Sequence, residues 1–360
     1  MGKRVTINDI AAKAGVSATT VSMILNHRED VHFSDETILN VLKISEKLGY
    51  TSPKASKRSG SGSTKNMLLA VCPSYENMYY SRIVDIMQKE ALSLGYQMVS
   101  INTYRDAKTE QSIESLVQAM KIGGVIFLYK PLNTDVPRLL AKSVPVLLLY
   151  DNHYEYGIDM VEMDNHKIGR IVGDYLLSLG HRDIAAIFSH LTEKNIGRMQ
   201  KYEGIRESFF MHGIDPNEHL KLICLPKNNV KQRSLNGYNL GYMLTEKLLA
   251  DTFQVSAIAA DNDSVAYGVM DAIIKKKKRI PQDYSVIGCD NLPVSGFMRM
   301  GLTTVETGST LYAKDAIHII TRRMGRSDEE DHEGDVLRGV YRVAYEPKII
   351  VRNTTGKFNP

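Results

Sequence analysis

Four small side chains near the N-terminus form a pattern suited to contact with nucleic acid. Ser17, Ala18, Thr19 and Ser22 lie close together in a stretch with helical spacing. Hydroxyl groups hydrogen-bond to base edges and phosphates, and small side chains let a helix backbone approach the bases closely. An ordinary solvated helix face would carry more Lys and Glu. The pattern therefore favours a DNA-recognition helix over the alternative, a generic three-helix bundle.

Three short helices are predicted to position this surface. Thr6 can cap the first helix through Asp9, and Gly15 ends it. Ser17 can cap the second helix, and Ser34 the third. The apolar residues expected to share a core are Ile7, Ile10, Ala11, Ala14, Val21, Ile24, Leu25, Ile38, Val41, Leu42 and Leu48. Two short helices joined by a tight glycine turn, with a third completing the core, predict a helix-turn-helix domain over residues 1–53.

The distribution of charge separates this head from the rest of the chain. Residues 1–65 hold ten basic and six acidic side chains, and the other 295 residues are balanced, so the formal net charge of +4 belongs to the head and linker. A basic excess of this kind suits a polyanionic partner. Residues 54–66, rich in Gly, Ser and Lys, are predicted to be a hinge or linker. Within it Lys54, Lys57 and Arg58 can contact phosphates.

The body, residues 67–353, alternates short apolar runs with stretches of helical spacing. The runs that read as strands are 67–72, 96–101, 123–129, 144–150, 184–188, 220–225, 256–260 and 284–288. Buried strands alternating with helices predict an α/β body with parallel sheets, and four such units on either side of about residue 164 predict two similar lobes.

The sequence offers no specific support for catalysis, a metal or a cofactor. It contains no phosphate-binding loop, nucleophile elbow or HExxH motif. The acidic run 328–331 with His332 reads as a surface loop, and the basic run 275–279 as a solvated helix end. Cys72, Cys224 and Cys289 read as buried free thiols of a reducing compartment. Without a secretory signal or a long apolar run, the chain is expected to be cytoplasmic, associated with the nucleoid and not membrane-bound.

The head has a specific resemblance to a known family. Residues 5–26 read VTINDIAAKAGVSATTVSMILN, and residues 34–37 and 47–50 continue the match. They resemble the N-terminal signature of the lactose-repressor (LacI/GalR) family of bacterial transcription regulators. Weaker matches follow in order through the body, at residues 180–184, 260–264, 280–291, 302–305 and 347–352.

The resemblance implies roles for individual residues of the head. Ala18 and Thr19 would hold the two main base-reading positions. Met23 stands where many members carry Arg or His; it can touch a thymine methyl but cannot hydrogen-bond to guanine. The residues that would position the DNA backbone are Thr6, Ser17, Ser22 and Asn26. No leucine lies between Thr51 and Asn66, so the family's apolar wedge into the minor groove is missing and its kinked operator geometry is not expected here.

The resemblance also implies a body like the periplasmic sugar-binding proteins, with an effector between two Rossmann-like lobes. Crossovers are expected near residues 163, 291 and 324, giving lobe 1 about 67–163 and 292–324 and lobe 2 about 164–291 and 325–353. The implied effector-binding residues are Tyr79, Tyr80, Asp151, Arg198, Lys201, Asn262 and Asp290. Lys201 replaces the family's Arg, and Arg198 lies one turn earlier. The alternatives are lobe packing for the tyrosines and helix capping for the aspartates, and Asp263 reads as a structural helix-start residue.

These expectations combine into one interpretation. The chain is expected to be a homodimeric, sequence-specific DNA-binding regulator, and its resemblance favours a repressor. Its expected partners are double-stranded operator DNA and a small-molecule effector of the carbohydrate class. A regulator of the same fold controlled by a protein corepressor, a solute-binding protein and a sugar-active enzyme are the alternatives. A solute-binding protein would carry an export signal and no DNA-binding head, and this sequence has the reverse.

Overall fold

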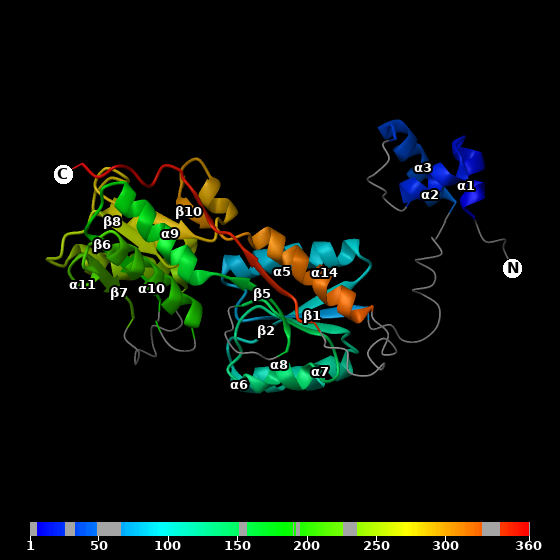
Figure 1. The fold of residues 1–360 in the computed structure, drawn as a ribbon, viewed down its shortest axis with the longest axis horizontal. Coiled ribbons are helices and arrows are strands. Elements are labelled where there is room, and N and C mark those ends of the chain that lie inside the picture. The colour runs from blue at the N-terminus through cyan, green and yellow to red at the C-terminus, as the bar shows by residue number, and fades with distance from the viewer. Residues whose placement is uncertain are drawn as a thin grey trace. The chain divides into compact units, whose positions relative to one another are not determined.

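The computed structural model divides the chain into two compact units, Met1–Thr64 and Lys65–Pro360. It describes residues 6–25, 33–48, 66–150, 157–189, 191, 195–225, 236–325 and 339–359. Figure 1 shows the elements of both units. Along these residues no helix combines the length and apolar character needed to cross a bilayer.

The first unit consists of three helices, α1 (Ile7–Ala14), α2 (Ala18–Leu25) and α3 (Asp35–Lys47). Thr6 and Asp9 form a reciprocal capping box at the start of α1, and Gly15 ends this helix with a φ of 69°. The backbone N–H groups of Thr20 and Thr37 donate to the hydroxyls of Ser17 and Ser34, at 3.0 and 3.3 Å. The predicted caps are therefore confirmed.

A small apolar core holds the three helices of the head together. Ile10, Val21 and Val41, one from each helix, are fully buried at its centre. Ile7, Ala14, Leu25, Ile38 and Leu48 pack around them as predicted. Each helix alone is too short to be stable in water, so this shared burial sustains the recognition surface.

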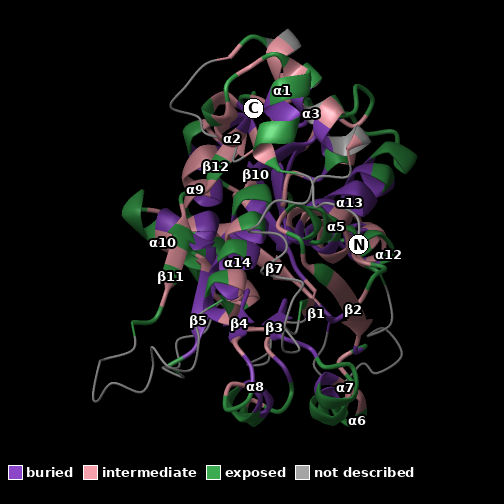
Figure 2. Ribbon diagram, turned by 90° about the vertical axis from the view of Figure 1, so that its right-hand side faces the viewer, coloured by how far each residue is buried: buried purple, intermediate pink, exposed green. Residues whose placement is uncertain are grey.

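The first sheet of the body has the strand order β11-β5-β4-β3-β1-β2, and every neighbouring pair is parallel. Its strands are β1 (Met67–Cys72), β2 (Gln97–Asn102), β3 (Gly124–Phe127), β4 (Val146–Leu148), β5 (Asp159–Met163) and β11 (Arg342–Tyr345). The helices α5 (Met78–Ser93) and α14 (Ser309–Met324) cover one face, while α6 (Ala107–Gln111), α7 (Ile113–Ala119) and α8 (Asp135–Leu140) lie on the other (Figure 2). This lobe therefore has three layers.

The second sheet has the order β12-β10-β9-β8-β6-β7, and only β12 runs antiparallel to its neighbour. Its strands are β6 (Ile184–Ile187), β7 (Leu220–Ile223), β8 (Ala257–Ala260), β9 (Ser285–Cys289), β10 (Thr303–Glu306) and β12 (Lys348–Ile350). Its helices are α9 (Asn165–Ser178), α10 (Ile196–Met211), α11 (Pro216–His219), α12 (Gly237–Leu249), α13 (Asp263–Lys275) and the 3-10 turn η2 (Pro293–Gly296). The predicted α/β fold with two lobes and parallel sheets is confirmed.

The boundaries of the lobes differ from the sequence expectation at two crossovers. Strand β10 pairs with β9 in the second sheet, although residues 292–324 were expected in the first lobe. Strand β11 pairs with β5 in the first sheet, although residues 325–353 were expected in the second. The chain therefore crosses between the end of β10 and the start of α14, and again between β11 and β12. The expected crossovers near residues 291 and 324 are wrong, because strand pairing with distant segments, and not local pattern, assigns β10 and β11 to their sheets.

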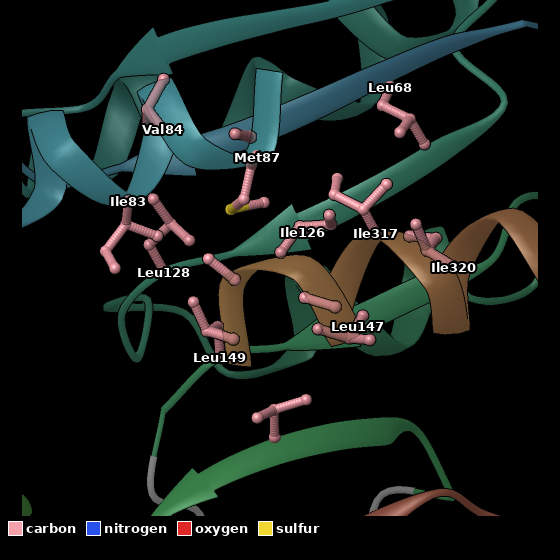
Figure 3. Packing of buried hydrophobic residues seen from close by; sticks show 14 of the residues in the cluster. Leu68, Ile83, Val84, Met87, Ile126, Leu128, Leu147, Leu149, Ile317 and Ile320 are labelled. Atoms are coloured by element: carbon pink, nitrogen blue, oxygen red, sulfur yellow. The ribbon is translucent and has the colours of Figure 1, made fainter. Parts of the chain in front are cut away.

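The core of the first lobe follows the alternation of side chains along its strands. Leu68, Ile126 and Leu147 point to the face that α5 and α14 cover, where they meet residues such as Met87 and Ile317 (Figure 3). The intervening positions of the same strands face α7 and α8 and form a second cluster. The three cysteines are free, and Cys72 and Cys289 are buried.

Candidate functional site

The candidate DNA-binding surface of the head is the outward side of α2. Thr19 is exposed, and Ala18, Ser22 and Met23 are partly exposed. At 3.6 residues per turn these four positions span an arc of about 140°. The buried Val21 and Ile24 lie on the opposite side, so core packing turns the small polar residues outward. This is the arrangement that the sequence predicted for a recognition helix.

Two of the head residues expected to contact the DNA backbone also cap helices. The hydroxyl of Thr6 accepts the N–H of Asp9 at 3.3 Å, and its own N–H donates to the Asp9 carboxylate at 2.7 Å. The hydroxyl of Ser17 accepts the N–H of Thr20 and lies 2.8 Å from its hydroxyl. Both residues are exposed, so capping leaves them at the surface. Asn26, Lys54, Lys57 and Arg58 lie outside the described residues, as does the hinge.

The second lobe gathers two cations around one buried carboxylate. Asp261 follows β8 and is only 2% exposed. Its Oδ2 lies 2.8 Å from Nε of Arg198, and its Oδ1 lies 3.7 Å from Nζ of Lys201. Lys201 also donates to the backbone carbonyl of Asp261 at 2.8 Å, and Ser189 donates to Oδ2 at 3.2 Å. The family resemblance implied both cations as effector-binding residues but did not include the carboxylate that holds them.

The protonation of this cluster follows from burial and charge. Burial alone would raise the pKa of Asp261, but Arg198 and Lys201 outweigh it and the pKa is lowered. Burial likewise opposes the charge of Lys201, yet Cys289, Asp261 and Asp290 raise the pKa of Lys201 to about 12. The three groups therefore form an ionised triad at neutral pH.

A close helix contact fixes the position of these cations. Arg198 and Lys201 lie on α10, which packs against α9. A Cβ placed on Gly204 would lie 2.0 Å from the carbonyl oxygen of His166, and one on Gly169 would lie 1.9 Å from that of Lys201. Both glycines are therefore needed for the two backbones to approach this closely.

Asp290 follows β9 and is the second carboxyl group of the site. It has a φ of 115°, and its N–H donates to the carbonyl of Val305 at 3.0 Å. Burial raises its pKa well above the usual range, Lys201 opposes this effect, and Asp263 and Asp261 reinforce it. A protonated carboxyl group donates as well as accepts, which suits a ligand hydroxyl. No helix begins at Asp290, so the capping alternative does not apply to it.

Asp263 is structural, as predicted. Its carboxylate accepts from the N–H of Leu292 at 2.8 Å, from the Ser295 hydroxyl at 2.5 Å and from the Thr304 hydroxyl. Burial raises its pKa to about 6, against these hydrogen bonds. The neighbouring Asn262, an expected effector residue, caps α13 by accepting the N–H of Val265 at 3.0 Å. The side-chain oxygen of Asn262 is therefore already engaged in capping α13.

The first lobe contributes tyrosines from the first turn of α5. The rings of Tyr79 and Tyr80 meet edge to face, with centroids 5.1 Å apart. The Tyr79 hydroxyl is hydrogen-bonded to that of Tyr312 and lies 3.7 Å from the sulfur of Met163. This favours the packing alternative for Tyr79. Burial raises the pKa of Tyr80, while the charges of Arg105 and Arg198 lower it. Tyr80 therefore interacts electrostatically with Arg198 of the second lobe, and both Tyr79 and Tyr80 interact with Asp290.

Three residues absent from the sequence expectation join the site: Asp261, Arg105 and Tyr312. Asp261 and Arg105 both follow the carboxyl ends of strands, where open α/β sheets bind ligands. The same rule selected Asp290, so the signal for them was available. Asp151 lies outside the described residues. No cluster of His, Cys, Asp or Glu suited to a metal ion occurs within the described ranges.

The basic run 275–279 behaves as a helix end. Lys275 closes α13 and lies 3.2 Å from Glu246, and Arg279 pairs with Asp283 at 2.8 Å. The side chains of Lys275 and Arg279 are 61% and 71% exposed. Exposed pairs of this kind contribute little stability, which agrees with a solvated surface. The acidic run 328–331 and His332 lie outside the described residues.

Comparison with known proteins agrees with this division of the chain. Residues 6–52 match the family of bacterial regulatory proteins described as the lacI family, and residues 65–332 match the periplasmic binding proteins and sugar-binding domain of the LacI family. The HTH-type transcriptional repressor PurR of Mannheimia succiniciproducens is 25% identical, covering 98% of this chain and 99% of its own.

Two solved structures share the fold. A LacI family transcriptional regulator from Enterococcus faecium with bound ribose has a TM-score of 0.67 and 21% identity, covering 81% of this chain and 100% of its own. The lac repressor dimer bound to operator and the anti-inducer ONPF has a TM-score of 0.64 and 22% identity, covering 98% of this chain and 100% of its own.

Proposed function

The chain belongs to the LacI family of bacterial regulatory proteins, and on this premise we propose how it regulates transcription. It is a DNA-binding transcriptional repressor with a helix-turn-helix head and a periplasmic-binding-protein-like body. We propose that a carbohydrate-class effector binds between the lobes of the body and controls affinity for the operator. The head would comprise residues 1–53 and the hinge residues 54–66.

The exposed side of α2 supports the DNA-binding half of the proposal. Thr19 presents a methyl and a hydroxyl group, and Ala18 leaves room for the backbone to approach base edges. Ser22 and Met23 lie on the same side of the helix. In this proposal Ala18, Thr19 and Met23 read bases, while Thr6, Ser17 and Ser22 position the backbone of the DNA.

The single observation that carries the effector half is the convergence of polar groups at the carboxyl ends of strands from both sheets. Tyr80 from the first lobe interacts with Arg198 and Asp290 from the second. An aromatic face suits the CH face of a sugar, and carboxyl groups suit its hydroxyls. We propose that Tyr80, Asp290 and Arg198 contact the effector directly, with Lys201 and Asp261 holding Arg198 in place.

A contact between the lobes offers a route by which the ligand acts on the heads. Arg82 of α5 donates to the carbonyl of Asn291 at 3.2 Å and to the hydroxyl of Thr310 at 3.2 Å. Asn291 directly follows Asp290 and also accepts from Arg352 at 2.7 Å. A ligand that binds one arrangement of the lobes better than another would alter this contact. Only such differential affinity can change operator binding.

We propose that the functional unit is a homodimer whose two heads read an approximately palindromic operator. The body carries large exposed apolar side chains, with Phe297 60% and Met298 93% exposed beside the second sheet. Burial of such side chains between two copies would favour association. Sedimentation of Met298→Asp should show a weaker dimer than wild type, with Lys276→Asp, on the exposed helix end, as the control.

The decisive experiment is selection of bound sequences from random DNA, repeated with and without a mixture of sugars. The proposal expects a recurrent two-fold half-site whose recovery changes with the sugars, and a Thr19→Ala variant with altered preference at one base pair. Recovery of no recurrent sequence would refute the DNA-binding role. A recurrent half-site that no sugar affects would instead favour a protein corepressor.

A further inference from the structure

A half-buried cation on the first-lobe side of the site, Arg105, has no carboxylate partner among the residues that the structure describes. Arg105 follows β2, and its guanidinium lies 4.7 Å from the centroid of the Tyr129 ring. Its backbone N–H donates to the hydroxyl of Thr103 at 3.3 Å. Across the described ranges no Asp or Glu forms an ion pair with Arg105. Its guanidinium donors are therefore not taken up by a carboxylate of the described residues.

Hydrogen bonds to its hydroxyl group hold the Tyr129 ring, over which Arg105 lies, in a fixed position. The Tyr129 hydroxyl donates to Oε1 of Glu110 at 2.5 Å and lies 2.5 Å from the hydroxyl of Thr103. Glu110 is fully buried, and its Oε2 accepts the N–H of Leu132 at 2.7 Å. Hydrogen bonds thus occupy both oxygens of Glu110 and hold the Tyr129 ring in place, and among the described ion pairs Glu110 has none with Arg105. The result is a fixed aromatic platform beneath a cation.

The backbone is strained at Arg105 and at Asp290. Tyr104 and Arg105 have φ values of 50° and 54°, in the left-handed region that L-residues rarely adopt. In the second lobe Asp290 and Asn291, which follow β9, have φ values of 115° and 47°. Strain of this kind persists where the surrounding structure enforces it, and it clusters at ligand sites. Both strained pairs follow strands that end at the proposed effector site.

The cations around this site differ in whether a carboxylate pairs with them. Arg105, Arg198 and Lys201 supply three cations, and both guanidiniums act on the Tyr80 hydroxyl. Asp261 neutralises one positive charge of the second-lobe pair. Asp290 and Asp263 add two further carboxyl groups on the second-lobe side. Of the three cations, Arg105 is the one that forms no ion pair with a carboxylate among the described residues. A partly buried cation without a counter-ion is costly to desolvate, and an anionic ligand removes that cost.

We propose that the effector carries an anionic group, a carboxylate or a phosphate, and that Arg105 binds this group from the first lobe. A planar guanidinium can donate two parallel hydrogen bonds to a carboxylate or to a phosphate. Its contact with the Tyr129 ring orients the Arg105 guanidinium before the ligand binds. Tyr80 and Asp290 then bind the sugar ring and its hydroxyls. The effector class is accordingly a sugar acid or a sugar phosphate. This inference rests on the proposed function, because it concerns the ligand of the same site.

Isothermal titration calorimetry on the full-length protein tests the inference with matched ligands. The sets are glucose, glucuronate and glucose 6-phosphate; galactose, galacturonate and galactose 6-phosphate; and ribose with ribose 5-phosphate. At least one acid or phosphate should bind about 10- to 100-fold more tightly than its neutral counterpart, as expected for a charge-assisted contact. The member that binds distinguishes a carboxylate from a phosphate effector.

Variants separate a direct contact from a general effect of charge. Arg105→Gln should abolish the preference for the anion, and Arg105→Lys should retain part of it. Arg138→Gln should leave it unchanged, because Arg138 is an exposed residue of α8 beside Asp135. Thermal melts by circular dichroism establish that each variant is folded; if Arg105→Gln is unfolded, the matched ligands and Arg105→Lys decide the question.

The inference is overturned if neutral sugars bind as tightly as their anionic counterparts, if no acid or phosphate of the panel binds, or if folded Arg105→Gln keeps the preference. Binding to the selected operator is measured in parallel. A protein that binds the operator but shows no preference for anions overturns this inference alone. A protein that binds no operator overturns the proposed function instead.

Discussion

A buried ion pair that closes the first sheet provides a quantitative test of the fold. Nε and Nη2 of Arg323, in the last turn of α14, lie 2.7 and 2.8 Å from the two carboxylate oxygens of Asp159 at the start of β5. The two side chains are 6% and 5% exposed. Asp159 also accepts the N–H of Tyr341 at 2.9 Å, directly before β11. Arg323 additionally donates to the carbonyl of Gly339. The pair therefore connects α14 and the segment directly before β11 to the start of β5.

Arg323→Met removes the cation while keeping a long side chain. Because the Asp159 carboxylate is then buried without its partner, the free energy of unfolding should fall by about 3–5 kcal/mol. For a unit of this size each kcal/mol shifts Tm by roughly 2 °C, so Tm should fall by about 6–10 °C. The control is Lys89→Met, which breaks the Lys89–Asp85 pair at 2.7 Å with side chains 75% and 58% exposed. That exposed pair should contribute only about 0.3–0.5 kcal/mol.

Urea unfolding and scanning calorimetry of the full-length protein measure both variants. The double variant Asp159→Leu with Arg323→Met replaces both charges by apolar groups and should lose less stability than the two single variants together. If Arg323→Met lowers stability no more than Lys89→Met does, burial does not strengthen this pair and the reasoning is refuted.

Three further predictions concern other parts of the chain. Gly204→Ala should destabilise the body by about 1–3 kcal/mol and weaken effector binding, because its Cβ would lie 2.0 Å from the His166 carbonyl oxygen. Urea unfolding measures the stability and calorimetry the binding. The control is Gly339→Ala, whose Cβ would meet no atom within 4 Å. Burial lowers the pKa of His181 against the raising effect of the Gly356 carbonyl, so the unfolded state gains a proton first as pH falls below about 6.5. The free energy of unfolding should then decrease from that pH down to the lowered folded pKa, and a His181→Gln variant with the same pH slope as wild type would contradict this. Met23→Arg should shift the preference at one base pair toward guanine by about 1–3 kcal/mol in DNA selection, and an unchanged half-site would count against a base-reading role.

The head was predictable because its signals are local. Capping by Thr6, Ser17 and Ser34 involves residues three positions apart, and the glycine stop at Gly15 depends on one φ angle. Such contacts form within a single turn of chain, so residue types at fixed short spacing predict them. The repeated strand and helix pattern likewise determined the parallel α/β body.

The arrangement of the site was predictable only in part. The rule that ligands bind at the carboxyl ends of parallel strands selected Asp290, and applied consistently it would have selected Asp261 and Arg105. It could not show that Tyr79 is bonded to Tyr312, far along the chain, or that Asn262 caps a helix as well as lying beside the site. Those pairings depend on how distant elements pack.

By itself the sequence determined the class of this protein: a basic helix-turn-helix head, a linker without the family's leucine, and a two-lobed α/β body. Only the tertiary structure decided which lobe receives β10 and β11, which carboxylate holds Arg198 and Lys201, and that Arg105 lies over the Tyr129 ring. The physical reason is the distance along the chain at which the interactions act. Caps and helix faces depend on near neighbours, whereas strand pairing and buried ion pairs join residues such as Asp159 and Arg323, whose separation no local pattern encodes.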